Sequence, residues 1–474
     1  MRENDSIQKR RVRAGGLLIL AHCFFCVLFS LESAEAVENF KLRVAVAEGV
    51  TSGRLLGQGL TLRDSCGVDS KPSDGAQVVA SRSGVSVGGG DFSLPVGISA
   101  SGGLGWDKNR YRGTLSIVKA KSGFTVVNEV DLESYLRGIL KIEMNPEWPS
   151  EALKAQAILA RTYAAGNRGR FAAWGYDLCA TVKSQVYRGV NAEDPRTDAA
   201  VSATRGMILT WGNRPADVYY HSDSGGATAD VAQVWGGSRH YLRVQREIVD
   251  YVSPYSSWKT TLNVSQVTAA AAKMGLSVGT VESVEVSLKD DAGRAVWLRL
   301  RGSKGVADVK AHAFRMAVGS NVLRSTNFRM AENAVASLSP PAVLQTPVVS
   351  FVAPVAVDAS ISNDPLVEMT QKGVFSKAEM LDMLMNPSKR EEYIEIGRTR
   401  MPDVASPPPA RRERPLPKPA TNPPVVAAGS FTFLGKGWGH GVGLSQWGAK
   451  AMAERGMRFE EILAHYFPGT KIAE

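Results

Sequence analysis

Long apolar segments and cysteines are both scarce in this chain of 474 residues. Beyond the first 36 residues, no segment approaches the roughly 20 apolar residues that a bilayer-spanning helix needs. The chain has four cysteines, and two of them, Cys23 and Cys26, lie in an N-terminal segment that we expect to be removed. The remaining pair, Cys66 and Cys179, permits one disulfide without establishing it, so a disulfide-rich scaffold is excluded.

The N-terminal segment has the pattern of a secretory signal. A basic cluster in residues 2–13 precedes an uncharged apolar run in residues 17–29, and the A-E-A sequence of residues 34–36 follows. This order predicts cleavage after Ala36 and export to the periplasm, the cell wall or the extracellular space. We expect no stable membrane span after cleavage; an uncleaved anchor is the alternative interpretation of the same run.

Basic residues outnumber acidic ones. The 56 Lys and Arg against 46 Asp and Glu give a net charge of +10, and loss of residues 1–36 leaves 51 against 42, or +9. An exported basic protein suits an anionic polymer such as cell-wall glycan with acidic stems. Nucleic acid is not expected as a partner, because export separates the two and no recognition motif is present. Solubility of the surface alone would explain the charge equally well.

Strand-like and helix-like segments are mixed along the chain. Residues 37–130 show short apolar alternation broken by Gly, Ser and Asp, which predicts a β-rich part. Residues 131–330 form the candidate catalytic core, which residues 429–474 continue. Residues 331–428, between them, have the Pro-rich composition of an insertion or linker. Because no regular βαβ repeat is present, the expected fold class is α+β, with mixed short-strand sheets and a buried alanine-rich helix, interrupted by the Pro-rich insertion.

The alanine-rich helix is predicted over residues 151–165. Ser150 is the expected N-cap, strong helix formers follow, and Gly166 or Gly169 is the expected stop. Its many small side chains would let another element approach closely, so we expect the helix to be buried. Arg161 in that setting needs a structural hydrogen-bonding partner.

The candidate for acid/base chemistry is Glu143. It lies between an apolar segment and the rigid N-P-E-W-P turn. Its neighbours Ile142, Met144 and Trp148 would partly desolvate the carboxyl group and raise its pKa toward the range that a general acid needs. The alternative is structural: Glu143 would cap the turn or form an ion pair, for instance with Arg161.

Two further segments, residues 219–237 and 435–456, combine glycine, histidine and tryptophan. Dense glycines permit positive φ and close approach to a ligand. Tryptophan faces suit sugar rings, and amide or hydroxyl groups suit sugar hydroxyls. Taken singly, each glycine is also explained by a tight turn and each histidine by a satisfied core residue. The candidate binding residues are His221, Ser222, Ser224, Trp438, His440 and Gln446.

Two other chemistries are compatible with these side chains. A Ser-His-Asp hydrolase would use one of the two serines with one of the two histidines. However, no G-x-S-x-G elbow surrounds either serine, and neighbouring strand residues point to opposite faces. A metal site built from His221 and His440 lacks the local H-x-x-x-H or C-x-x-C spacing of a strong zinc motif. We therefore favour the glycosidic interpretation.

Five segments resemble the family of stage II sporulation protein D (SpoIID) and the amidase enhancer LytB. They are YRGTLSIV (111–118), DLESYLRGILKIEMNPEWPSEALKAQAILARTYA (131–164), YDLCATVKSQVYRGV (176–190), YYHSDSGGATADVAQVWGG (219–237) and GWGHGVGLSQWGAKAMAERGMRFEEILAHYFPGTKI (437–472). The resemblance covers residues 40–330 and 430–474, and leaves only the signal and the insertion outside.

The resemblance implies a peptidoglycan lytic transglycosylase in which Glu143 matches the catalytic glutamate. Such an enzyme protonates the oxygen between N-acetylmuramic acid and N-acetylglucosamine, then helps the muramic C6 hydroxyl close a 1,6-anhydro ring. One carboxylate serves both steps because the nucleophile belongs to the substrate, unlike the paired carboxylates of most glycosidases. The family also implies that the six candidate binding residues line the cleft around Glu143.

The resemblance bears on metal and partner as well. Some family members resemble zinc proteins with a second cysteine after the one that matches Cys179. Ser184 replaces that cysteine here, so we predict no metal and no cofactor. The enhancer members suggest a rival function, a non-catalytic wall-binding module that stimulates an N-acetylmuramoyl-L-alanine amidase. A third hypothesis is a scaffold whose insertion recruits partners.

Overall fold

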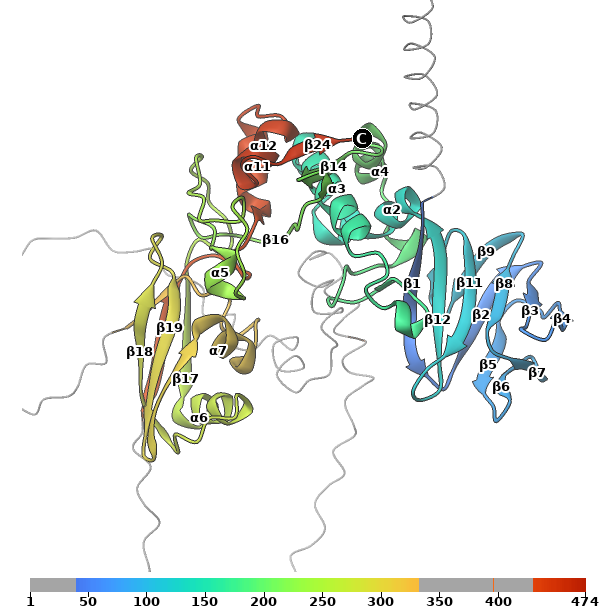
Figure 1. Ribbon diagram of the computed structural model, residues 1–474, viewed down its shortest axis with the longest axis horizontal. Coiled ribbons are helices and arrows are strands. Elements are labelled where there is room, and N and C mark those ends of the chain that lie inside the picture. The colour runs from blue at the N-terminus through green and yellow to red at the C-terminus, as the bar shows by residue number, and fades with distance from the viewer. Residues whose placement is uncertain (1–39, 332–394, 396–428) are drawn as a thin grey trace, which may run out of the picture. The chain divides into compact units, whose positions relative to one another are not determined.

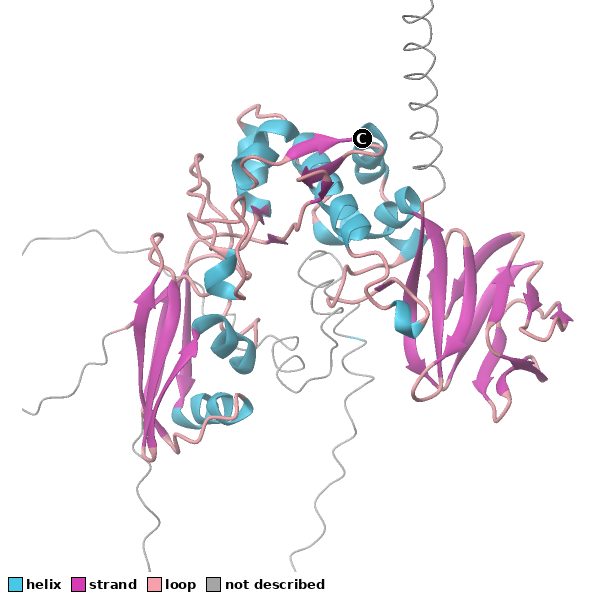
Figure 2. Ribbon diagram, viewed as in Figure 1, coloured by secondary structure: helices cyan, strands magenta, loops and turns pink. Residues whose placement is uncertain are grey.

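The computed structural model describes residues 40–331, residue 395 and residues 429–474 (Figure 1). The predicted signal, residues 1–36, lies outside the described residues, as does the predicted insertion apart from residues 331 and 395. Helices and short strands are mixed throughout the described chain (Figure 2). The predicted α+β fold class is confirmed. Within the described ranges, no helix is both long and apolar enough to cross a bilayer.

Two β-sheets share one core in the first part of the chain. The first has the order β13-β1-β12-β11-β8-β3-β4, with β1 (Lys41–Val50), β3 (Thr61–Arg63), β4 (Asp69–Ser70), β8 (Val96–Ser99), β11 (Thr114–Lys119), β12 (Phe124–Asp131) and β13 (Leu178–Cys179). The second has the order β10-β9-β2-β5-β6-β7, with β2 (Ser52–Gln58), β5 (Ala76–Ala80), β6 (Gly84–Val87), β7 (Gly90–Ser93), β9 (Gly102–Trp106) and β10 (Asn109–Arg110). Side chains of both sheets, Leu42 and Leu55 among them, form one hydrophobic cluster, and Trp106 packs edge-on against Phe124.

Three helices follow: α2 (Leu132–Glu143), α3 (Ser150–Gly166) and α4 (Pro195–Ala203). The predicted alanine-rich helix, residues 151–165, is α3, one residue longer at each end, and most of its side chains are buried. The prediction that Ser150 is its N-cap is wrong. Pro149 (φ −53°, ψ 139°) is the extended residue before the helix, and Ser150 is already helical.

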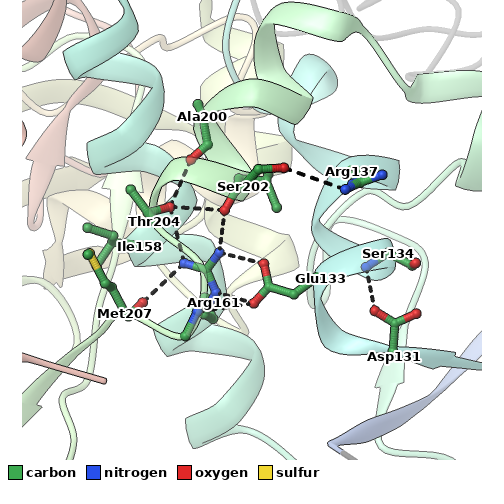
Figure 3. A network of polar contacts seen from close by, with 12 residues as sticks. Asp131, Glu133, Ser134, Arg137, Ile158, Arg161, Ala200, Ser202, Thr204 and Met207 are labelled. Atoms are coloured by element: carbon green, nitrogen blue, oxygen red, sulfur yellow. Dashed lines mark hydrogen bonds and ion pairs between the residues drawn. The ribbon is translucent and has the colours of Figure 1, made fainter. Parts of the chain in front are cut away.

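Arg161 of α3 is fully buried and binds Glu133 of α2 (Figure 3). Its Nε and Nη2 atoms donate to the two carboxylate oxygens of Glu133 at 2.8 and 2.7 Å. The remaining N–H groups reach the Thr204 hydroxyl and the carbonyl oxygens of Val201 and Met207. The expected structural partner of Arg161 is therefore confirmed, and this ion pair fixes the start of α2 against the middle of α3.

The chain after α4 forms two smaller groups of elements. One contains the sheet β15-β14-β24, the parallel pair β16-β23 and three helices: β14 (Ile208–Trp211), β15 (Arg214–Pro215), β16 (Tyr220–His221), α5 (Val231–Val234), β23 (Leu444–Ser445), α11 (Gln446–Glu454), α12 (Phe459–Tyr466) and β24 (Lys471–Ala473). The other contains the sheets β17-β22-β21 and β18-β19-β20 with two helices: β17 (Trp258–Asn263), α6 (Val264–Lys273), β18 (Val281–Lys289), β19 (Ala295–Gly302), β20 (Gly305–Lys310), α7 (Ala311–Val318), β21 (Phe328–Met330) and β22 (Ser430–Gly435). Two 3₁₀ turns, η1 (Ala172–Trp174) and η2 (Gly189–Ala192), precede α4.

The C-terminal residues complete sheets that earlier segments begin. β22 lies between β17 and β21, with antiparallel pairing on both sides. β23 pairs in parallel with β16, and β24 pairs with β14. Residues 429–474 are therefore part of the same folded unit as residues 40–331.

The buried ion pair gives a stability prediction. Glu133→Gln should lower the free energy of unfolding by about 3–5 kcal/mol, because it leaves the Arg161 guanidinium buried without a counter-charge. Denaturant unfolding measures this. The control is Asp69→Asn, which removes the partner of Arg63 in an exposed ion pair of 2.7 Å and should have a much smaller effect, because solvent screens exposed pairs. Equal, small losses for the two variants would contradict the structural role of the buried pair.

Candidate active site

Glu143 is the last residue of α2, and the sequence after it ends the helix. Met144 is extended (φ −143°, ψ 138°), and the next two residues are Asn145 and Pro146. Proline has no N–H to donate and disfavours a helical conformation of the residue before it, so α2 cannot continue. Glu143 therefore lies at the negative end of the helix dipole, where a second negative charge is disfavoured.

The carboxyl group of Glu143 is enclosed by protein, although the residue as a whole is only partly buried. Burial raises the pKa of Glu143 from 4.5 to about 7, while hydrogen bonds from the Tyr220 hydroxyl and the Val186 N–H act in the opposite direction. The expected desolvation of this acid is confirmed. The alternative ion pair between Glu143 and Arg161 is wrong, because Arg161 is occupied by Glu133.

Tyr220, the donor to Glu143, is partly buried and belongs to a chain of hydrogen-bonded polar side chains. Its hydroxyl lies 3.4 Å from the Nε2 atom of Gln185, whose Oε1 atom accepts a hydrogen bond from the Tyr135 hydroxyl at 3.2 Å. Burial holds the pKa of Tyr220 well above its ordinary value. Tyr220 therefore keeps its proton over the physiological range and remains a hydrogen-bond donor to the acid.

Sequence reasoning missed Tyr220, Val186 and Gln185. Adjacent strand residues point to opposite faces, but a strand of two residues shows no alternation pattern from which Tyr220 could have been chosen. Tyr220 and His221 are the two residues of β16, so only one of them can face Glu143. Val186 contributes a backbone group, for which side-chain chemistry gives no signal.

Gln446 is the candidate binding residue that the structure brings into contact with Glu143. Its Nε2 atom donates to the main-chain carbonyl of Glu143 at 2.8 Å and to the Oε1 atom of Gln156 at 3.3 Å. That carbonyl is one of the helix-terminal acceptors without a partner inside α2. Gln446 thus holds the end of the helix in position, and within the described chain it forms no hydrogen bond with the carboxyl group.

His221 and His440 lie together, with ring centroids 5.5 Å apart. The Nδ1 atom of His221 lies 3.2 Å from the Val442 carbonyl oxygen, and the Nδ1 atom of His440 accepts from the Val442 N–H at 3.1 Å. Burial lowers the pKa of both, that of His440 to about 3, so both imidazoles are neutral. Trp235 packs against His440 with centroids 4.9 Å apart.

Both histidines are close to Tyr220 of β16, but neither forms a hydrogen bond with Glu143 in the described chain. His440 is hydrogen-bonded to the Tyr220 backbone, and His221 follows Tyr220 directly in β16. Because the Tyr220 side chain reaches Glu143, the alternation of the strand directs His221 the other way. A cleft shared by both histidines and the acid stays a prediction.

The remaining candidates are positioned by the glycine-rich segments. Ser224 is fully buried and donates to Glu247 Oε1 at 2.5 Å. The Ser222 carbonyl accepts from the Trp447 N–H at 3.0 Å. Trp438 packs edge-on against Tyr255 with centroids 4.7 Å apart. No serine hydroxyl is hydrogen-bonded to a histidine within the described ranges, so nothing in them supports a Ser-His hydrolase.

Close packing explains one glycine of the G-W-G-H-G-V-G sequence in particular. Gly439 has φ +124°, and a Cβ atom there would lie 2.5 Å from the Cβ of His221. The close approach at Gly439 is thus to another part of the protein, His221.

Among the described residues, no group of three or more His, Cys, Asp or Glu could hold a metal ion. At the position of the missing second cysteine, the Ser184 hydroxyl lies 3.4 Å from Cys179 Sγ.

Fold and site together define an α+β protein with one desolvated carboxylic acid at a helix C-terminus, held by a tyrosine hydroxyl and a main-chain N–H. Comparison with known proteins extends this. The family model described as SpoIID, stage II sporulation protein, matches residues 120–211, which include Glu143 and all of α3. The chain therefore contains a SpoIID family domain.

Several curated proteins are similar to this chain. An uncharacterized protein of Brachyspira hyodysenteriae is 29% identical over 220 residues, 46% of this chain and 58% of that protein. The amidase enhancer of Bacillus subtilis is 25% identical over 338 residues, 71% of this chain and 40% of the enhancer. Stage II sporulation protein D of Bacillus subtilis is 24% identical over 364 residues, 73% and 76% of the two chains. The chain thus spans about half the length of the first two relatives.

The hydrogen bond from Tyr220 gives a prediction about the acid. Tyr220→Phe should raise the pKa of Glu143 further, because this hydrogen bond favours the ionised carboxylate. A ¹³C NMR titration of protein labelled at its glutamate carboxyl groups measures the change, with the Glu143→Gln spectrum assigning the signal. Tyr255→Phe is the control. Tyr255 packs on Trp438 and does not contribute to the pKa shift of Glu143, so its loss of a hydroxyl should leave that pKa unchanged. An unchanged or lower pKa in Tyr220→Phe would show that the hydrogen bond is absent.

Desolvation of Glu143 also predicts how stability depends on pH. In the folded state Glu143 keeps its proton up to about pH 7, whereas in the unfolded chain it loses the proton near pH 4.5. The free energy of unfolding therefore falls as the pH rises from about 4.5 to about 7. Glu143→Gln removes this loss, and its stability relative to the wild type should rise by up to about 3 kcal/mol between pH 4 and pH 8. Thermal unfolding across this range measures it; a pH-independent difference would argue for a solvated carboxyl group.

Proposed function

We propose that this protein is an exported peptidoglycan lytic transglycosylase that cleaves the bond between N-acetylmuramic acid and N-acetylglucosamine and forms 1,6-anhydro-N-acetylmuramic acid. The observation that carries the proposal is the state of Glu143. An acid whose pKa lies near 7 is protonated in part of the population at neutral pH and ionised in the rest, which matches a group that donates and then accepts a proton.

The reaction needs two proton transfers. Protonated Glu143 gives its proton to the oxygen that links muramic C1 to C4 of N-acetylglucosamine, the C1–O bond breaks, and N-acetylglucosamine leaves with a free hydroxyl. The resulting carboxylate then takes the proton of the muramic C6 hydroxyl, whose oxygen attacks C1 and closes the anhydro ring. Glu143 ends protonated, as it began, and no water is consumed.

The surroundings of Glu143 suit both steps. Burial stabilises the neutral acid that begins the reaction, whereas Tyr220 and the Val186 N–H stabilise the carboxylate formed after the first step. No second carboxylate is hydrogen-bonded to Glu143 in the described chain. In glycosidases that consume water, the distance between the paired acids either leaves room for a water molecule or lets the second acid act as the nucleophile. Here the muramic C6 hydroxyl is the nucleophile, so no second acid is needed.

The substrate and location follow from the same proposal. The partner is a peptidoglycan glycan strand, the protein acts in the periplasm or cell wall after export, and neither nucleic acid nor a cofactor is required. The second candidate function is a non-catalytic enhancer of a wall amidase. The observation that favours it is the match over 338 residues to a protein named amidase enhancer.

Replacement of Glu143 tests the catalytic role. Glu143→Gln keeps the shape of the side chain and removes its ionisable proton, so anhydro-muropeptide release from purified sacculi should fall by about 10²–10⁴-fold or more. Mass spectrometry of the products measures this, and sacculus binding should remain. Glu147→Gln, an exposed change in the following turn, should keep wild-type activity.

The same assay separates the two functions. Wild-type release of anhydro-muropeptides by folded Glu143→Gln would end the catalytic proposal. An enhancer would release no anhydro product by itself, would accelerate peptide release by a purified N-acetylmuramoyl-L-alanine amidase, and would do so equally well with glutamine at position 143.

A further inference from the structure

Two tryptophans pack on each other near the C-terminal end of α2. Trp148 is in the turn between α2 and α3, and Trp447 is the second residue of α11. Their ring centroids are 5.0 Å apart with an interplanar angle of 62°, and both are only partly buried. Gln446, the residue before Trp447, binds the Glu143 carbonyl at 2.8 Å, which fixes this aromatic pair next to the end of α2.

A cavity of about 240 Å³ opens beside Trp447. One wall is α11 and the other is the segment of residues 249–252. Val252, on that second wall, is 86% exposed. Trp447 and the exposed aliphatic side chain of Val252 therefore line the same small cavity. The volume lies just below the usual range for sites of drug-sized ligands, roughly 300–1,000 Å³, and suits about one pyranose ring.

Four charged side chains line the cavity, and two of them have no ion-pair partner among the described residues. Lys450 and Glu454 are bound to each other at 2.5 Å. Arg455 and Asp250 line the same cavity and form no ion pair or side-chain hydrogen bond within residues 40–331 and 429–474. One supplies hydrogen-bond donors and the other acceptors. Together they suit a ligand that offers hydroxyl, amide and carbonyl groups.

We propose that this cavity is a subsite for one N-acetylated sugar of the glycan strand. The apolar face of the pyranose ring lies on Trp447, Asp250 accepts from a hydroxyl or the acetamido N–H, and Arg455 donates to an acceptor oxygen of the sugar. That oxygen belongs either to the acetamido carbonyl, present on both sugars, or to the lactyl carboxylate, present on muramic acid alone. The inference deepens the proposed function and rests on it.

Binding can be measured separately from cleavage. The ligands are chitohexaose, which has only acetamido groups, and a stem-free muramyl-containing hexasaccharide. Both are titrated calorimetrically into Glu143→Gln protein, which keeps the muramyl ligand intact. Trp447→Ala should weaken binding of both ligands about tenfold or more, as truncation of a central tryptophan anchor does elsewhere. Arg455→Gln and Asp250→Asn, both exposed changes, keep the test interpretable if Trp447→Ala does not fold.

Matched controls exist in the chain. Trp174 is 44% exposed, and Lys121 Nζ lies 4.8 Å from its ring centroid. Trp447 has a similar neighbour, because Lys450 Nζ lies 5.4 Å from the Trp447 ring centroid. Arg205 is an exposed arginine after the end of α4, as Arg455 caps the end of α11. Trp174→Ala and Arg205→Gln should leave both affinities unchanged.

Each outcome decides a separate point. Loss of affinity for both ligands in Arg455→Gln assigns the acetamido carbonyl as its partner, and loss for the muramyl ligand alone assigns the lactyl carboxylate; both support the subsite. Wild-type affinities in folded Arg455→Gln and Asp250→Asn, and in Trp447→Ala where it folds, overturn it. Tryptophan-dependent binding by a wild-type protein that releases no anhydro product would keep the subsite and refute the proposed catalysis.

Discussion

The buried ion pair between Arg161 and Glu133 is the constraint on which the position of the candidate acid depends. Glu133 lies in the first turn of α2 and Glu143 is its last residue, so fixing one end of this short helix against α3 also fixes the other. Such a pair is not an efficient source of stability, because desolvation offsets most of its attraction. Its contribution here is geometric: a bidentate contact between planar groups permits one orientation of the two helices.

The chemistry of Glu143 results from a balance between opposing effects. Burial and the helix C-terminus both disfavour the carboxylate, whereas Tyr220 and the Val186 N–H favour it. Burial alone would raise the pKa of Glu143 further, and the hydrogen bonds alone would lower it. The combination leaves the pKa at about 7, where the protonated and ionised forms of Glu143 are both populated at neutral pH.

Local sequence predicted the parts of this structure that depend on local physics. The alanine-rich composition located α3, and the burial of that helix required a partner for Arg161, although it could not say that the partner was Glu133. The neighbours of Glu143 indicated a desolvated carboxyl group. What could not be predicted was long-range. Tyr220 and Val186 reach Glu143 from segments far along the chain, and the strand that carries Tyr220 has only two residues, too few for an alternation pattern to stand out.

The contact between Gln446 and Glu143 shows how an interrupted chain can still complete one site. The two residues are 303 positions apart, and β22, β23 and β24 each pair with strands that precede the predicted insertion. The entropic cost of closing even a fully flexible connection grows only with the logarithm of its length, about 0.6 kcal/mol for each doubling. Three separate pairings and a buried helix contact outweigh such a cost easily. The boundary between β21 and β22 is therefore a place where added length has little effect on the geometry around Glu143.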